Sequence, residues 1–185
     1  MSELVETNES SKTETTAAEV VAIHTKLLNA GIRVWIDGGW AVDALLGQQT
    51  RSHGDVDVLV QQQDITKLRG LLEAEGFINV PRDDASEYGF HLGNNKGAEI
   101  DVHGILINDQ GAWKHADPVE EDIYPAESLS GRGVIDATPV HTLSPEYIVL
   151  FHSGYELQQK DYNDISALCA KYNLPLPEEY QHFAK

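Results

Sequence analysis

The sequence predicts an α+β fold in which a mixed β-sheet is flanked by helices and followed by two C-terminal helices. Two observations lead to this prediction. Strand-like runs alternate with amphipathic helical stretches over the first 80 residues, and later runs pair as two hairpins. Because the alternation of strand and helix is too brief for a doubly wound sheet, we expect antiparallel pairs beside the helices.

The N-terminal half begins with a helix that carries its own start signal. Thr16 can cap this helix while Glu19 reaches back to it, as in a capping box, and Gly31 ends it. The elements expected after it are a strand over 33–36, a helix over 40–46, a strand over 55–60, a helix over 63–75 and a short strand over 77–80.

The C-terminal half is expected to hold two hairpins and two helices. The elements are strands over 88–93 and 98–107, a loop-like acidic stretch over 109–127, a hairpin over 133–142, a helix from 144 to about 157 and a helix over 161–172. Ser144 followed by Pro145 is typical of a helix start. Pro175 and Pro177 are expected to close the ordered part.

A single domain is expected over residues 16–174. The chain has 185 residues, which suits one domain of ordinary length, and it shows no internal repeat. Residues 1–15 are rich in Ser, Thr and Glu, so we expect a disordered tail there. Residues 175–185 are expected to form a C-terminal tail.

The charge balance excludes several classes of protein. Lys and Arg number 13 against 30 Asp and Glu, a net charge of −17, which disfavours binding to nucleic acids and anionic membranes. A single cysteine, Cys169, excludes an internal disulfide and a cysteine-based zinc site. No apolar run of about 18 residues and no secretion signal is present, so we expect a cytoplasmic protein. The sequence leaves open whether the chain forms a homodimer.

Two predicted strands each place acidic side chains on one face. Side chains alternate along a strand, so Asp55 and Asp57 share a face. Glu99, Asp101 and His103 share a face of the second strand in the same way. An edge strand facing solvent would also explain Asp-x-Asp alone, but two such strands side by side would crowd three or four acids. That crowding is costly unless a cation lies among them, and carboxylates without cysteine favour Mg²⁺ or Mn²⁺. We therefore expect metal-assisted chemistry on a phosphate-bearing substrate.

Several other residues are candidates for binding phosphate. Gly38 and Gly39 lie between a strand and a helix, where free backbone N–H groups can face an anion, although a plain tight turn explains them equally. Arg51 and His53 precede the acidic pair and can reach phosphate oxygens, and His53 also fits an ordinary loop residue. Lys160 is either a phosphate ligand or a surface lysine.

Three stretches of the chain resemble one family. DGGWAVDALLGQQTRSHGDVDVLV (37–60) resembles the Gly-Gly-Trp, Asp and Thr-Arg-x-His-x-Asp-x-Asp signature of small antibiotic nucleotidyltransferases. EIDVHGILINDQG (99–111) resembles their second active-site strand, and VLFHSGYELQQKDYNDISAL (149–168) is similar to the C-terminal helices of the lincosamide enzymes. The chain thus resembles the short lincosamide nucleotidyltransferases, to which the aminoglycoside 2″-nucleotidyltransferases are closely related.

This resemblance implies the nucleotidyltransferase fold of the DNA-polymerase-β type and a reaction. The family transfers a nucleoside monophosphate, usually AMP from ATP, to a hydroxyl of a drug and releases pyrophosphate. Two Mg²⁺ ions are implied, with Mn²⁺ as a substitute. By position, Asp55 and Asp57 correspond to the metal-binding pair. Asp101 corresponds to a third carboxylate that shares metal binding and activation of the hydroxyl, and all three are expected to be catalytic.

The residues and the resemblance together give two expected binding sets. The nucleotide set is Gly38, Gly39, Arg51, His53 and Lys160. The acceptor set is Glu99, His103 and Tyr155. Gly54 stands where relatives usually carry a larger, often basic residue, and 112–140 match poorly. The identity of the drug is therefore less well defined than the chemistry.

Three other functions stay open at this point. The same chemistry on an aminoglycoside is favoured by the negative charge, because those drugs are polycations. A nucleotidyltransferase-like module without catalysis, such as an antitoxin, would keep the fold, although the intact acids speak against it. A housekeeping transferase that acts on another small alcohol also fits the sequence.

Overall fold

The computed structural model describes residues 14–119 and 121–183. Its α-helices in these ranges are α1 (Ala17–Asn29), α2 (Gly38–Leu46), α3 (Ile65–Glu73), α4 (Pro145–Phe151) and α5 (Gln159–Tyr172). Its 3₁₀ helices are η1 (Gln62–Asp64), η2 (Ala126–Leu129) and η3 (Glu178–Phe183). Its strands are β1 (Val34–Asp37), β2 (Val56–Gln61), β3 (Ile78–Val80), β4 (Gly89–Gly93), β5 (Glu99–Ile107), β6 (Trp113–His115), β7 (Gly131–Ile135) and β8 (Thr138–Thr142). Among the described residues, no helix combines the length and the apolar composition that a membrane crossing requires.

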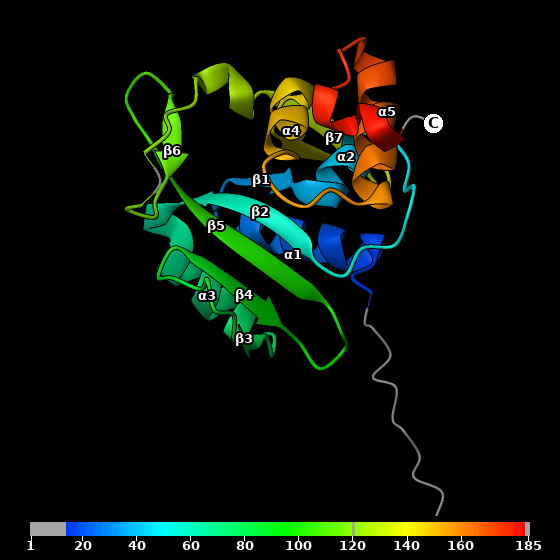
Figure 1. Cartoon of the computed structure of the whole chain (residues 1–185). Helices are drawn as coiled ribbons and strands as arrows, with labels where there is room; N and C mark the ends of the chain where they lie inside the picture. The colour runs from blue at the N-terminus through cyan, green and yellow to red at the C-terminus, as the bar shows by residue number, and fades with distance from the viewer. Residues whose placement is uncertain (1–13, 120, 184–185) are drawn as a thin grey trace, which may run out of the picture.

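The strands form one mixed sheet, which confirms the predicted fold class. Their order is β3-β4-β5-β2-β1-β8-β7, and β6 pairs with β5 beside this path. The β2–β5 and β1–β8 pairs are parallel, whereas the two predicted hairpins, β4–β5 and β7–β8, are antiparallel. In Figure 1, α1 and α3 lie behind strands β2, β5 and β4, and α2, α4 and α5 are grouped above these strands.

One face of the two central strands is wholly apolar. Val56 and Val58 of β2 and Ile100 and Val102 of β5 are buried, whereas the alternate acidic positions are only partly buried. The amphipathic helix α3 adds Leu68 to the same core. Each of these side chains contributes about 1.5–3 kcal/mol relative to leaving it exposed. This core fixes which face of β2 and β5 carries the acids.

The start of the chain is packed from a residue that was expected to belong to a tail. Thr16 caps α1 in the predicted capping box. Thr15 is buried, and its hydroxyl donates to the Gly54 carbonyl at 2.8 Å and accepts from the Glu99 N–H at 3.0 Å. The predicted tail over 1–15 is therefore wrong at its last residue, and residues 1–13 lie outside the described residues.

The stretch over 109–127 is less loop-like than predicted. It contains the short strand β6, in which Trp113 pairs with Ile107 of β5. The Trp113 ring is buried, and its Nε1–H donates to Ser128 Oγ at 2.6 Å. A three-residue strand carries too little periodicity to be recognised in the sequence.

The two C-terminal helices are present with shifted ends. α4 stops at Phe151 and does not reach Leu157, because the chain turns at Gly154, whose φ of +80° a helix does not allow. α5 begins before the predicted Asp161, because Gln158 caps it and Asp161 completes the capping box as its third residue.

The segment after residue 174 is not a free tail. Residues 178–183 form η3, and Tyr180 is fully buried. The Tyr180 hydroxyl donates to the His152 carbonyl at 2.5 Å, just after α4. Pro175 and Pro177 therefore redirect the chain back onto the domain instead of ending its ordered part.

We predict that Tyr180→Ala lowers the free energy of unfolding by about 3 kcal/mol or more, because it removes a fully buried aromatic ring and leaves a cavity. Urea unfolding followed by circular dichroism measures this loss. Gln181→Ala, an exposed neighbour in η3, is the matched control and should change little. Equal unfolding midpoints for the two variants would contradict the packing of η3.

Candidate active site

A row of four titratable side chains crosses the sheet. In the parallel β2–β5 ladder, Asp57 lies opposite Asp101. Asp37 of β1 lies opposite Asp57 on one side, and His91 of β4 lies opposite Asp101 on the other. Because directly opposite residues point to the same face, four strands bring these groups together. The predicted alignment of the two acidic faces is confirmed.

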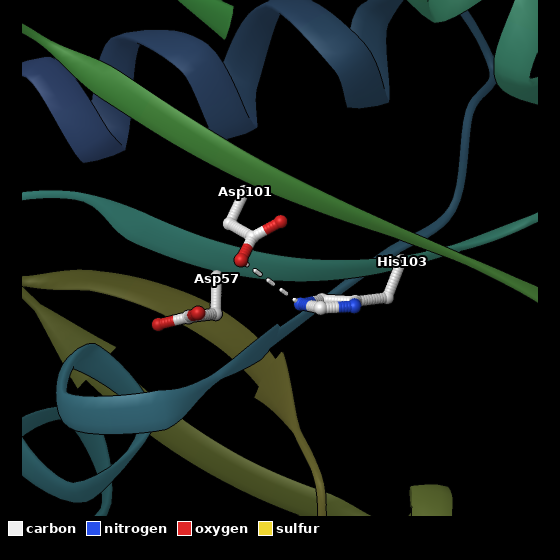
Figure 2. A group of neighbouring side chains, drawn as sticks. All are labelled: Asp57, Asp101 and His103. Carbon is white, nitrogen blue, oxygen red and sulfur yellow. Dashed lines mark ion pairs between the residues drawn. The ribbon is translucent and has the colours of Figure 1, made fainter. Parts of the chain in front are cut away.

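Three of the neighbouring side chains form a group that fits a divalent cation. One ligand atom each from Asp57, Asp101 and His103 lies within 4.8 Å of the other two. Figure 2 shows the carboxylate of Asp101 between the other two residues, with its Oδ2 3.4 Å from His103 Nε2. The two carboxylates are oxygen ligands of the kind that Mg²⁺ and Mn²⁺ prefer, whereas the imidazole is a donor more typical of softer metal ions.

The third predicted acid of the sequence motif stands slightly apart. Asp55 precedes β2 and is not a member of this group of three. Its Oδ2 lies 3.7 Å from His91 Nε2, which in turn contacts Asp101, and 3.9 Å from Arg82. The nearby His91 imidazole lowers the pKa of the Asp55 carboxyl. Asp55 is therefore an ionised acid at the edge of the group, and its predicted role as a metal ligand stays a prediction.

Burial and neighbouring acids act strongly on Asp57. Burial, with a smaller contribution from Asp55, raises the pKa of Asp57 to about 7. Ionising this carboxyl at neutral pH thus costs free energy unless positive charge is added nearby. A cation bound to the group would supply that charge, which is the physical reason to regard these residues as a metal site.

Two histidines compensate the charge of Asp101. Burial lowers the pKa of His103, but the Asp101 carboxylate outweighs burial and raises it to about 9. The pKa of His91 is likewise raised to about 9 by Asp101 and Asp55 against burial. Burial raises the pKa of Asp101, but hydrogen bonds from the two histidines keep it well below its usual range. At neutral pH the site therefore holds protons that a metal ion would displace.

The glycine pair packs directly onto the acids. Gly38 has a φ of +58°, and a Cβ there would lie 2.1 Å from Asp57 Oδ2. Only glycine combines this backbone angle with this close approach. The helix α2 begins at Gly38, two residues earlier than predicted, and the Asp37 side chain makes no capping hydrogen bond to it. The first N–H groups of α2 thus lie beside Asp57, where an anion can meet them.

The two basic residues before the acidic pair are held by other acids. A Cβ on Gly39 would lie 2.4 Å from Arg51 and 2.6 Å from His53, so both side chains cover this glycine. Arg51 makes a bidentate ion pair with Asp164 of α5, in which Nη2 donates to Oδ2 at 2.8 Å and Nε donates to Oδ1 at 3.2 Å. His53 is buried and contacts Asp43 of α2 at 2.5 Å. These contacts tie the loop to two helices, and the predicted phosphate roles of Arg51 and His53 stay predictions.

Two hollows adjoin the row on its two sides. A pocket of about 190 Å³ is lined by Asp37, Gly38, Asp57 and Tyr155, together with Phe151 and His152. A larger pocket of about 470 Å³ contains Asp101, His103 and His91 in its wall. The acids therefore separate a space beside the glycine loop from a larger space beside the histidines.

The remaining residues predicted for the site differ in where they lie relative to the acids. Tyr155 lies in the same hollow as Asp57. Glu99 lies on the site face of β5 opposite Gly93, two residues before Asp101 and away from His103 along the strand. Lys160 is exposed on α5. Sequence reasoning missed Asp37 and His91. The available signals were a carboxylate directly before the glycine pair and a single polar residue between Phe90 and Leu92.

Comparisons with known proteins show relatives that are similar in sequence and in fold. The profile of the aminoglycoside-2''-adenylyltransferase family matches residues 19–168. A lincosamide resistance protein of Staphylococcus haemolyticus is 32% identical over 74% of this chain and 84% of its own length. A 2''-aminoglycoside nucleotidyltransferase of Escherichia coli is 33% identical over 71% of each chain. The lincomycin-bound crystal structure of the lincosamide antibiotic adenylyltransferase LnuA superposes with a TM-score of 0.75 at 29% identity, covering 84% of this chain and 97% of that one.

We predict that Gly38→Ala abolishes Mn²⁺ binding, because the new methyl group would displace the Asp57 carboxylate. Gly47→Ala at the other end of α2 is the matched control, since Gly47 has a φ of +77° but nothing within 4 Å of a Cβ. Both variants should lose about 1–2 kcal/mol of stability from the left-handed backbone angle. Isothermal titration with Mn²⁺ distinguishes them, and equal affinities would contradict the contact with Asp57.

We also predict that Mn²⁺ affinity rises by about tenfold or more between pH 6 and pH 8, because the ion competes with the protons on Asp57 and His103. The sign follows from the raised pKa values: both groups hold protons at pH 6, and Asp57 has lost its proton at pH 8. Isothermal titration at the two pH values and equal ionic strength measures the change. A constant affinity would show that these protons do not compete with the ion.

Proposed function

The chain belongs to the aminoglycoside-2''-adenylyltransferase family, and we propose that it transfers AMP from ATP to a hydroxyl of a lincosamide antibiotic. It is a nucleotidyltransferase of the antibiotic-resistance type. Enzymes of this kind use a nucleoside triphosphate and a divalent metal. The observation that carries the proposal is the group formed by Asp57, Asp101 and His103 between two hollows.

We assign the metal to the acidic group and the two substrates to the two hollows. Asp55, Asp57 and Asp101 would hold two Mg²⁺ ions, which when bound offset the charge on the transferred phosphoryl group and on the pyrophosphate. ATP would enter beside Gly38, where the N–H groups at the start of α2 bind its phosphates. Lys160 remains our proposed additional contact for pyrophosphate.

The acceptor hydroxyl would enter from the larger hollow. Asp101 and His103 line this pocket, so the hydroxyl oxygen can lie within reach of a proton acceptor on the side opposite the glycine loop. The ionised Asp101 carboxylate orients the hydroxyl and takes its proton as the oxygen attacks. The pyrophosphate then leaves toward the N-terminus of α2.

The lining of the larger pocket favours a lincosamide. It combines the carboxylates of Asp84 and Asp117 with the apolar side chains of Ala85 and Val119. A lincosamide carries one amine beside apolar groups and matches this mixture, whereas an aminoglycoside carries several amines. The protonated histidines of the same wall would repel such a polycation.

An aminoglycoside acceptor is the second candidate, and the net charge of −17 favours it. Incubation of the protein with ATP, Mg²⁺ and each drug, followed by mass spectrometry, separates the two. A product heavier than lincomycin by one adenylyl group supports the proposal. Adenylylation of aminoglycosides alone would replace it, and the absence of any adenylylated drug would contradict both.

We predict that Asp57→Asn reduces turnover at saturating Mg²⁺ by at least about 100-fold while the fold survives. The same variant should unfold at a higher temperature than wild type at pH 8 in the absence of metal. Because the folded-state pKa of Asp57 lies above its ordinary value, ionisation costs stability as pH rises through 7, and asparagine removes that cost. Steady-state kinetics and thermal melts test both parts, and near-wild-type turnover would contradict the assignment.

A further inference from the structure

His91 is a buried histidine at one end of the acidic row, and the reaction as described above gives it no part. It lies on β4 between Phe90 and Leu92, which are both buried. Its side chain is only 8% exposed, whereas that of His103 is 37% exposed. The antiparallel register with β5 places it directly opposite Asp101. The backbone ladder thus holds this imidazole beside the carboxylate.

The contacts of His91 point to one hydrogen bond and one charge contact. Its Nε2 lies 3.0 Å from Asp101 Oδ2, which is hydrogen-bond distance, and 3.7 Å from Asp55 Oδ2, which is not. An ionised carboxylate only accepts, so His91 Nε2 carries the proton and donates it. His103 Nε2 approaches the same oxygen of Asp101 at 3.4 Å. Both imidazoles therefore contact Oδ2, the oxygen that Figure 2 shows on the side of Asp57 and His103.

We infer that His91 is a positioning residue: its Nε2–H fixes the orientation of the Asp101 carboxylate within the group formed by Asp57, Asp101 and His103. The inference rests on the proposed function only in taking Asp101 as a metal ligand. His103 cannot do this alone, because its contact is longer and its side chain is more exposed. Partners of this kind orient metal ligands in many metal sites.

The test compares a substitution that removes the donor with one that keeps it. His91→Leu removes the N–H, whereas the amide of His91→Gln can donate from a similar position without being ionisable. His141→Leu on β8 makes the same change outside the site. Mn²⁺ affinity by isothermal titration is measured first, because it needs neither ATP nor a drug. The values of kcat and KM for ATP and the acceptor follow, with thermal melts for all variants.

We expect His91→Leu to lose about 10–100-fold in Mn²⁺ affinity and kcat, with KM values and melting temperature near wild type. His91→Gln should recover most of both, and His141→Leu should behave as wild type. Wild-type Mn²⁺ affinity and kcat in His91→Leu would overturn the inference. Equal losses in the leucine and glutamine variants, both folded, would also overturn it.

Two further outcomes of these experiments would also test the role of His91. Should His91→Leu fail to fold, His91→Met replaces it, because a flexible side chain without a donor adapts to the same space. Loss of Mn²⁺ affinity in that variant supports the inference, and its retention overturns it. If no drug is adenylylated by the wild type while the histidine variants still differ in Mn²⁺ affinity, the proposed acceptor is wrong and the role of His91 stands.

Discussion

β2 and β5 run parallel from the Val56–Ile100 pair to the Gln61–Ile105 pair, and this ladder holds Asp57 beside Asp101 against their mutual repulsion. Two carboxylates so close together in a partly buried place would separate if they stood on loops. The backbone hydrogen bonds and the apolar face on the other side of both strands prevent that, because turning one acid away would expose core side chains to water. The favourable burial of one face thus maintains the unfavourable charge on the other.

The molecule offsets the negative charge of these two carboxylates in two ways, and both depend on protons that can be released. The pKa of Asp57 is raised to about 7, so this carboxyl keeps its own proton below that pH. The negative charge of Asp101 is compensated by His91 and His103. Neither neighbour is an arginine that would compensate the charge permanently. At Asp57 and Asp101 a divalent cation can therefore replace protons, and the fixed charge of Arg82 lies near Asp55 alone, at 3.9 Å. An acidic group built in this way is stable when empty and also suited to bind an ion, which agrees with the proposed reaction.

The sequence allowed the strands and their faces to be predicted because both depend on a local pattern. Alternation along β2 and β5 identified which side chains share a face, and the capping box at Thr16 located the start of α1. Contacts between distant segments left no such local signal. The ion pair of Arg51 with Asp164 joins residues 113 positions apart, and the burial of Tyr180 depends on η3 folding back past two prolines. His91 was missed because one polar residue in a short strand looks the same whether it faces solvent or an active site.

The residues that carry out the chemistry lie on strands, whereas those that select the acceptor lie on loops. The transferred group must lie in line between two oxygens, and only closely spaced strands with a fixed register can hold ligands with that accuracy. Asp57, Asp101 and His103 accordingly come from β2 and β5. Asp84 and Asp117, which line the acceptor side, come from loops that can change without disturbing the register. A fold arranged in this way can keep one reaction while its acceptor varies, which is consistent with relatives named for lincosamides and for aminoglycosides within a single family.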